Sequence, residues 1–147
     1  MQVVDEEQMK ELESMDALYK AEKPGEKLSK TILVVEDDEL MGQFITQALQ
    51  DEVSYRTLIA TDAFRALSIV RNIKPSLFLL DYLLPKMNGI ELYDQLHSAA
   101  GLEDVPTIFI SAVPPIKQLK KRRIYYLEKP FELDEFLRKI KEILAEE

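Results

Sequence analysis

Residues 77–89 read LFLLDYLLPKMNG, and the segment from Leu77 to Leu80 is the most apolar part of the chain. A short, unbroken apolar run is typical of a strand that is buried on both faces of a sheet. Asp81 follows this run and precedes a loop that contains a proline and a glycine. Because open α/β sheets bind their ligands at the carboxyl ends of the strands, Asp81 is a candidate functional residue.

Three other segments have the same arrangement, in which an apolar run is followed by polar side chains. If these strands are parallel, their ends bring together several carboxylates, one hydroxyl group and one ammonium group. Side chains of these types can hold a divalent metal ion and a phosphoryl group. Residues 32–35 lead into Glu36, Asp37 and Asp38, residues 107–110 lead into Ser111, and residues 125–128 lead into Lys129.

Apolar residues at helical spacing lie between the predicted strands. Thr61-Asp62 and Asn88-Gly89 are predicted to open two of the helices. Strands that alternate with helices indicate βαβ units and a parallel sheet, so the fold class is α/β. The expected strands are 32–35, 55–60, 77–80, 107–110 and 125–128, and the expected helices centre on residues 41–48, 66–70, 90–96 and 133–144.

The composition excludes several classes of protein. The chain has 147 residues, which fits one compact domain with a tail, and it has no cysteine, so disulfides and thiol catalysis are excluded. Acidic residues outnumber basic ones by 27 to 19, and the net charge of −8 makes direct nucleic-acid binding unfavourable. No apolar run approaches the ~20 residues of a membrane helix, and no signal peptide is recognisable, so we expect a cytoplasmic protein without a membrane segment.

Residues 1–29 precede the predicted domain, which covers residues 30–147. Five apolar residues recur in this extension at about helical spacing, and Pro24-Gly25 would end such a helix. Two interpretations stay open: a solvated arm or cloning remnant, and a helix that packs on the domain or on a partner. The five apolar residues are Met9, Leu12, Met15, Leu18 and Tyr19.

Four motifs occur in a fixed order: ILVVEDD, LFLLDYLLPKMNG, IFISA and YYLEKPF. With the interval of 44 residues between Asp37 and Asp81, the chain resembles the receiver domain of two-component response regulators from about Lys30 to Glu147. The resemblance implies a doubly wound, flavodoxin-like sheet of five parallel strands in the order 2-1-3-4-5. It also implies that Asp81 becomes phosphorylated.

A cofactor is expected because crowded carboxylates repel one another, and a hard divalent cation relieves that repulsion. Mg²⁺ typically takes one or two carboxylates, a backbone carbonyl group and several waters. Asp37 and Asp81 suit the carboxylate positions and the carbonyl group of Leu83 suits the third, as the resemblance implies. Glu36 would act through water or a hydrogen bond. Asp38 is expected to point into the start of the following helix, where an acid is favourable.

Lys129 and Ser111 complete the expected site. The lysine offers a point charge that can also pair with Asp81 before reaction, and the serine offers a hydroxyl group to a phosphoryl oxygen. The resemblance implies a cis peptide bond between Lys129 and Pro130. It also implies a switch made by Ser111 and Tyr126, in which the hydroxyl group and the aromatic ring turn inward. The alternative for Tyr126 is a half-exposed aromatic residue of a strand.

The segment between Ser111 and Lys129 departs from the family, because it is shorter by about one helical turn and contains Pro114-Pro115. The fourth helix is therefore expected to be truncated, shifted or disordered, and homodimerisation through this face is left open. The basic residues here form either a solvated face or a docking patch for an acidic partner. They are Lys117, Lys120, Lys121, Arg122 and Arg123.

The sequence also leads to specific expectations for His97 and Leu83. His97 is the only histidine, and we expect it to be exposed on a helix. Leu83 is apolar where side chains line the phosphoryl path, so it could exclude water and prolong the phosphorylated state. A comparison of dephosphorylation with Leu83→Asn tests this.

The resulting function is a signalling module, not an enzyme, with at most weak self-dephosphorylation. Its partners are a histidine kinase or histidine phosphotransfer protein and a downstream output protein. The chain is either a stand-alone regulator or a receiver from a larger regulator or hybrid kinase. A non-phosphorylated interaction module would need a broken acidic site. An aspartyl phosphohydrolase would need a second acid where Leu83 stands, so its proton donor is missing.

Overall fold

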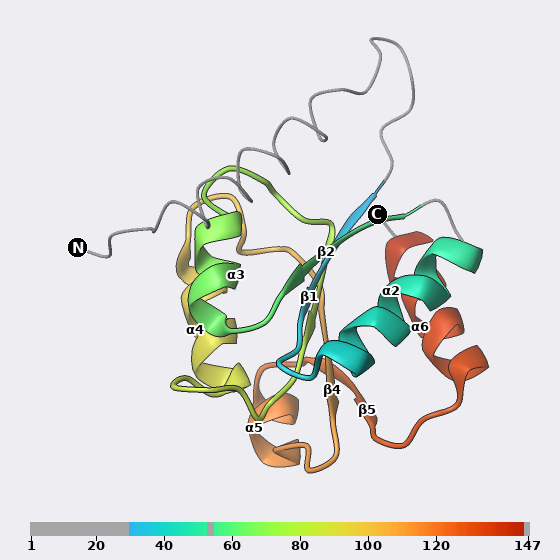
Figure 1. The fold of residues 1–147 in the computed structure, drawn as a ribbon. Helices are drawn as coiled ribbons and strands as arrows, with labels where there is room; N and C mark the ends of the chain where they lie inside the picture. Colours follow the sequence, from blue (N-terminus) through green and yellow to red (C-terminus); the bar gives the residue numbers. More distant parts are fainter. Residues whose placement is uncertain (1–29, 53–54, 146–147) are drawn as a thin grey trace, which may run out of the picture.

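The computed structural model describes residues 30–52 and 55–145 (Figure 1). Five parallel strands form one sheet in the order β2-β1-β3-β4-β5, which confirms the predicted topology. The helix predicted within residues 1–29 lies outside the described residues. The strands are β1 (Thr31–Val35), β2 (Arg56–Ala60), β3 (Leu77–Leu80), β4 (Thr107–Ser111) and β5 (Tyr125–Glu128).

Helices cover both faces of the sheet. Figure 1 shows α3 and α4 on one side and α2 and α6 on the other. This three-layer arrangement follows from right-handed crossovers between neighbouring parallel strands. None of the helices in the described part of the chain is long and apolar enough to cross a membrane. The helices are α2 (Glu39–Glu52), α3 (Ala63–Ile69), α4 (Gly89–Ser98), α5 (Ile116–Lys121) and α6 (Leu133–Ala145).

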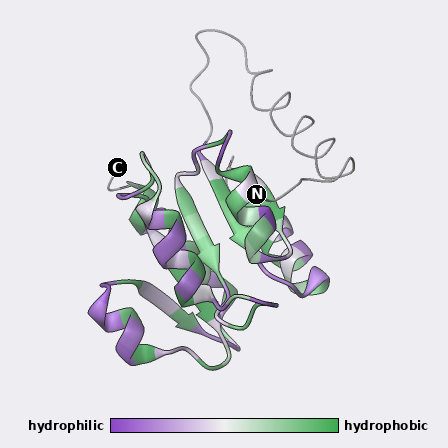
Figure 2. Ribbon diagram, turned by 90° about the vertical axis from the view of Figure 1, so that its left-hand side faces the viewer, coloured by the Kyte–Doolittle hydropathy of each residue, from purple (hydrophilic) through white to green (hydrophobic). Residues whose placement is uncertain are grey.

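The central strands are buried on both faces, as their apolar runs predict. Every residue of β1, β3 and β4 is buried, whereas β2, at the edge of the sheet, is mostly half-buried. Figure 2 shows this as green, hydrophobic strands between helices that carry both colours. Successive side chains of a strand point to opposite faces, so each strand contributes to two cores. Leu33 and Val35 face α3 and α4, and Ile32 and Val34 face α2 and α6.

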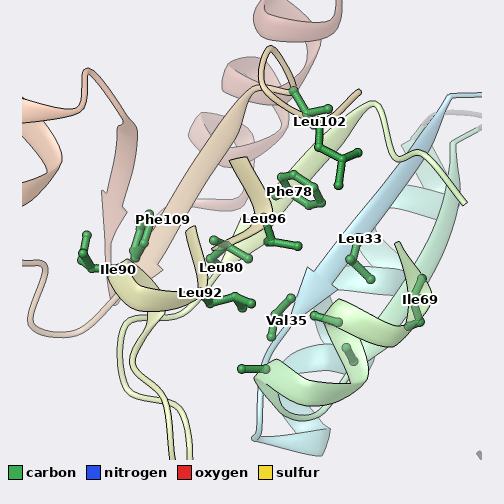
Figure 3. Close-up of a cluster of buried hydrophobic side chains, with 14 of the residues drawn as sticks. Leu33, Val35, Ile69, Phe78, Leu80, Ile90, Leu92, Leu96, Leu102 and Phe109 are labelled. Atoms are coloured by element: carbon green, nitrogen blue, oxygen red, sulfur yellow. The ribbon is translucent and has the colours of Figure 1, made fainter. Parts of the chain in front are cut away.

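The core on the α3–α4 side fixes the strand ends that carry polar residues. Apolar residues of β1, β3 and β4 meet those of both helices there, and they are almost completely removed from water. Such burial stabilises by roughly 25 cal/mol per Å² of apolar surface. Figure 3 shows the contact among Leu33, Val35, Ile69, Phe78, Leu80, Ile90, Leu92, Leu96, Leu102 and Phe109.

Both predicted helix caps are present. The side chain of Asp62 accepts a hydrogen bond from the backbone N–H of Arg65, at 2.8 Å, and opens α3. Asn88 does the same for α4 by accepting from the N–H of Glu91, at 2.9 Å. An uncapped helix leaves backbone donors without partners, so these side chains fix where the helices begin.

The sequence predicts a fourth helix that is truncated, shifted or disordered, and the structure has a short helix there, α5, of six residues. Its end is tied by two backbone hydrogen bonds, from Ile124 N–H to Leu119 O at 3.0 Å and from Arg123 N–H to Lys120 O at 3.1 Å. This pattern is a Schellman motif, and Arg123 occupies its left-handed position with a φ of 57°. Leu119 and Ile124 are buried and anchor the helix to the core.

The prediction that His97 is exposed is wrong. Its ring is half-buried, stacks on Tyr93 with centroids 4.0 Å apart, and meets Phe78 edge-on. One ring nitrogen lies 2.9 Å from the carbonyl oxygen of Tyr93 and the other lies 2.7 Å from that of Val105. His97 therefore ties α4 to the loop before β4, a contact that local sequence does not reveal because Val105 lies beyond the helix.

Candidate functional site

Asp81 lies directly after β3, between the carboxyl ends of β1 and β4. Its backbone N–H donates to Val35 O at 3.2 Å, which continues the ladder between β1 and β3. The side chain of Asp81 is 9% exposed, and its Oδ1 accepts a hydrogen bond from Leu83 N–H at 3.2 Å. The following loop thus holds one carboxylate oxygen and leaves the other directed to the site.

Glu36 and Asp37 bring two more carboxylates to this position. Both follow β1, and each places an oxygen within 4.8 Å of the others and of Asp81. Glu36 is only 3% exposed, whereas Asp37 is exposed. The predicted convergence of the strand ends is therefore confirmed for these three acids.

Lys129 lies between two of the acids. Its Nζ is 3.4 Å from Asp81 Oδ2 and 3.3 Å from Glu36 Oε2. Its backbone N–H donates to Ser111 O at 2.9 Å, which fixes the end of β5 to the end of β4. The bond between Lys129 and Pro130 is cis, as predicted.

The site carries more negative than positive charge. Burial and the neighbouring Asp81 raise the pKa of Glu36 to about 7, and the attraction of Lys129 only partly offsets these effects. A buried carboxylate next to another carboxylate resists ionisation because the second charge has little water around it. The cluster therefore binds a positive charge favourably.

The three carboxylates fit a divalent cation. Hard oxygen ligands from two or three acids, close together and partly open to water, are the donor set that Mg²⁺ prefers. Glu36, Asp37 and Asp81 are the carboxylates that could hold it. Leu83 lies beside them, because its N–H donates to Asp81 Oδ1, and the residue is 59% exposed. That its carbonyl group is a ligand stays a prediction.

Ser111 and Tyr126, the expected switch residues, lie on neighbouring strands. Ser111 is fully buried, and its Oγ accepts a hydrogen bond from Val113 N–H at 3.2 Å. Its hydroxyl group is not hydrogen-bonded to the side chain of Asp81 or Lys129, the two site residues nearest along the sheet edge. Tyr126 is half-buried and packs against the core on the α3–α4 side. The structure gives the positions of these two residues, and their role as a switch stays a prediction.

The side chain of Asp38 points away from the cluster and into the start of α2, as predicted. Its Oδ1 accepts hydrogen bonds from the N–H groups of Leu40 at 3.0 Å and Met41 at 3.2 Å, and so caps α2. The favourable interaction of an acid with the start of a helix accounts for this orientation.

Gly89 is a residue of the site that sequence reasoning used only as a helix opener. A Cβ atom at this position would collide with the carbonyl oxygen of Asp81 and would lie 2.8 Å from Phe109 Cε1. Its N–H also donates to Tyr82 O at 2.8 Å. The start of α4 therefore packs against the backbone of Asp81. The only signal in the sequence is a glycine after a cap residue, which does not reveal this approach.

Comparison with known proteins agrees with this geometry. The family model of the response regulator receiver domain matches residues 32–141. The DNA-binding response regulator MtrA of Mycobacterium leprae is 32% identical over 118 residues, which cover 78% of this chain and 51% of MtrA. Response regulator MprA of Mycobacterium sp. is 30% identical over 117 residues, which cover 77% of this chain and 50% of MprA.

A solved structure is similar as well. A CheY-like response regulator receiver domain protein from Methanospirillum hungatei superposes with a TM-score of 0.73 at 30% identity, covering 80% of this chain and 95% of that one. The chain belongs to the response regulator receiver domain family, whose members are phosphoacceptor signalling modules. It spans about half the length of the curated relatives MtrA and MprA.

Proposed function

We propose that Asp81 of this receiver domain accepts a phosphoryl group in the presence of Mg²⁺ and that the modification switches a protein-interaction surface. The observation that supports this most is the meeting of Asp81 with two other carboxylates and with Lys129 at one edge of the sheet. The proposal takes residues 30–147 as the domain and residues 1–29 as its extension.

The phosphoryl donor is a phosphohistidine on a histidine kinase or a histidine phosphotransfer protein. A carboxylate oxygen of Asp81 attacks the phosphorus atom, and an O–P bond forms as the P–N bond breaks. The imidazole leaves with the electron pair of that bond. The product is an acyl phosphate, which water can later hydrolyse, so the chain would have at most weak self-dephosphorylation and no other enzymatic activity.

The chain's own residues position and neutralise the transferring group. Lys129 Nζ lies 3.4 Å from Asp81 Oδ2, so it can shift from that carboxylate to a phosphoryl oxygen. Ser111, at the end of the adjacent strand, would donate its hydroxyl hydrogen to another oxygen. Asp37, Asp81 and the carbonyl group of Leu83 would hold Mg²⁺ directly, and Glu36 would act through water or a hydrogen bond. When bound, the ion supplies positive charge that offsets the negative charge of the transferring group.

The switch would change the face around β5. Movement of Ser111 toward the phosphoryl group leaves space into which Tyr126 turns, as the family resemblance implies. A two-state side chain biased by a local charge is sufficient to alter an interaction surface. The downstream partner would be a protein, homodimerisation stays open, and the chain itself would not contact nucleic acid.

The lengths of the relatives favour a second, compatible candidate. MtrA and MprA are about twice as long as the segment they share with this chain. The domain would then act as the receiver of a larger regulator, whose other part gives the response. The name of MtrA, a DNA-binding response regulator, suggests how such a response is given in that protein. A cytoplasmic location is part of this proposal.

Intact-mass measurement after incubation with acetyl phosphate tests the phosphoacceptor. The wild-type chain should gain the mass of one phosphoryl group with Mg²⁺ and much less without it, and Asp81→Asn should gain none. Asp38→Asn is the matched control, because Asp38 caps α2 outside the cluster, and it should react like the wild type. Equal modification of Asp81→Asn and the wild type would refute the proposal.

A further inference from the structure

Four cationic side chains at α5 and just after it form no ion pair with a carboxylate in residues 30–52 or 55–145. All four are exposed. Their neighbour Arg122 differs, because its guanidinium group binds both carboxylate oxygens of Asp94 at 2.9 Å. The four residues, called the basic patch below, are Lys117, Lys120, Lys121 and Arg123.

Apolar side chains lie beside the basic patch. Val113 is 65% exposed, Ile116 is 42% exposed, and Tyr125 is 43% exposed. Large exposed apolar residues next to unpaired cations fit a partner that is both acidic and apolar.

The helical geometry of α5 places part of the basic patch and one of its apolar neighbours on the side of the helix that faces away from α4. Leu119 points into the core and Arg122 points toward Asp94 of α4. At 100° per residue, Ile116 and Lys120 lie on the flank opposite to Arg122. The ion pair with α4 and the buried Leu119 hold α5 in place, so the flank is presented as a fixed surface.

The chain itself contains a segment with the matching chemistry. Residues 5–16 have six carboxylates and one lysine, and apolar residues recur among them at Met9, Leu12 and Met15. This segment lies outside the described residues. We propose that residues 5–19 dock on the basic patch and its apolar neighbours, and so cover the α5–β5 face.

The connection between the two is long enough. The connection from Lys30 to α5 has to cross the sheet from β1 to β5 and run along the length of a strand. β5 is three strands from β1, which is ~15 Å at the usual strand spacing, and a strand as long as β1 spans ~17 Å. Residues 20–29 can extend over ~33 Å. The segment can therefore reach α5 from Lys30 without strain in the connection.

Covalent connection also favours this occupant over a separate one. A tethered segment meets its site at an effective concentration in the millimolar range, which a separate protein seldom reaches. On the other side of Tyr126, a groove is lined by four acids, Glu132, Asp134, Glu135 and Glu142, and by two cations, Arg138 and Lys139. Because acids are in excess there, this groove is less favourable for the acidic segment than the basic patch. A second copy could instead offer the acids at the start of its α6, Asp134 and Glu135, to the basic patch, so the test must separate these occupants.

Paramagnetic relaxation in the full chain tests the proposal, since the absence of cysteine allows a single label. A nitroxide attached to Gln8→Cys should cause selective loss of the backbone amide signals of Lys120 and Tyr125, while the amide signals of α3 keep their intensity. Reversal of two charges, Lys120→Glu with Lys121→Glu, should restore the Tyr125 signal. Lys74→Glu, an exposed lysine before β3, is the matched control and should leave the loss unchanged. Adding Glu11→Lys and Glu13→Lys to the reversed pair should bring the loss back.

Two results would overturn the proposal. The first is a spectrum in which α5 and β5 lose no more signal than α3, or in which Lys120→Glu with Lys121→Glu changes the loss at Tyr125 no more than Lys74→Glu does. The second is a loss seen only between different molecules, in a mixture of labelled chains without isotope and isotope-enriched chains without label, which would make the occupant a second copy. The inference goes beyond the proposed function, and no phosphodonor is present, so its failure leaves the role of Asp81 untouched.

Discussion

At the scale of single residues, the site is governed by one cation between two buried carboxylates. Lys129 contacts both Glu36 and Asp81, but it cannot neutralise two carboxylates and an adjacent third. Removing a cation from such a cluster leaves buried charge without compensation, which is costly. This excess negative charge favours the binding of a divalent cation. The bound cation would then offset the charge of a phosphoryl group on Asp81.

This excess predicts a specific dependence on pH. With the pKa of Glu36 at about 7, its carboxyl group should titrate near neutrality in a carbon-detected NMR experiment, and Mg²⁺ should shift that titration to lower pH. Because the pKa in the folded chain exceeds the ordinary value of 4.5, the associated stability is present below pH 4.5 and is lost as the pH rises through 7. Affinity for Mg²⁺ should rise over the same interval, since the ion competes with the proton.

The variant Glu36→Gln separates the ionisation of Glu36 from that of other groups as the cause of the pH-dependent affinity for Mg²⁺. The amide keeps the shape but cannot ionise, so the change in Mg²⁺ affinity near pH 7 should flatten. Isothermal titration at several pH values measures it. An unchanged dependence on pH in Glu36→Gln would show that another group is responsible.

Gly89 gives a second prediction at this scale. Gly89→Ala forces a Cβ atom against the backbone of Asp81 and the ring of Phe109, and overpacking of this kind costs ~1–3 kcal/mol of the free energy of unfolding. Gly42→Ala is the control, because its Cβ would meet Ile59 at an ordinary 3.7 Å. That change should be neutral or stabilise α2 by up to ~1 kcal/mol. Urea unfolding measures both, and equal effects would contradict the argument.

At the scale of elements, most of the fold could be predicted because each signal is local. The apolar runs of β1, β3 and β4, and the caps Asp62 and Asn88, act within a few residues. The approach of the three acids could be predicted only once the strands were taken as parallel. Pairings between distant parts of the chain could not be predicted, because no spacing marks them.

The α4–α5 contact shows this limit. Arg122 and Asp94 are 28 positions apart, and the hydrogen bonds from Arg122 lower the pKa of the Asp94 carboxyl group. His97 joins α4 to Val105 in the same region. Both contacts depend on where α5 and the loop before β4 come to lie. The sequence predicts only that the α5 segment is shortened and contains Pro114-Pro115, and it predicts nothing about the loop.

Two residues with a left-handed backbone, Arg123 and Gly101, are predicted to change the stability in opposite directions when they are substituted. Arg123 has a left-handed φ of 57°, which costs a side chain other than glycine ~1–2 kcal/mol. Arg123→Gly should therefore stabilise the domain by roughly 0.5–1 kcal/mol. Gly101, with a φ of 86° and open space around it, is the counterpart, and Gly101→Ala should destabilise by about 1 kcal/mol. Thermal unfolding of both variants checks the signs, and the same sign for both would contradict the backbone argument.

At the scale of the whole molecule, the sheet brings together segments that are far apart in the chain. Glu36 and Lys129 are 93 positions apart, and they meet because β1 and β5 belong to one parallel sheet with all carboxyl ends at one edge. The same sheet places Ser111 and Tyr126 on the neighbouring strands β4 and β5. That a change at Asp81 reaches the face around β5 through these two residues stays a prediction.

The central claim is that Asp81 is the residue that carries the phosphoryl group while its neighbours bind Mg²⁺. A crystal structure determined after soaking with Mg²⁺ and beryllofluoride, a mimic of the phosphoryl group, tests it most directly. We predict beryllofluoride on a carboxylate oxygen of Asp81, contacts to it from Lys129 and Ser111, and a metal ion held by Asp37, Asp81 and the carbonyl group of Leu83. Beryllofluoride on another acid, or a bare Asp81 carboxylate in fully soaked crystals, would contradict the account.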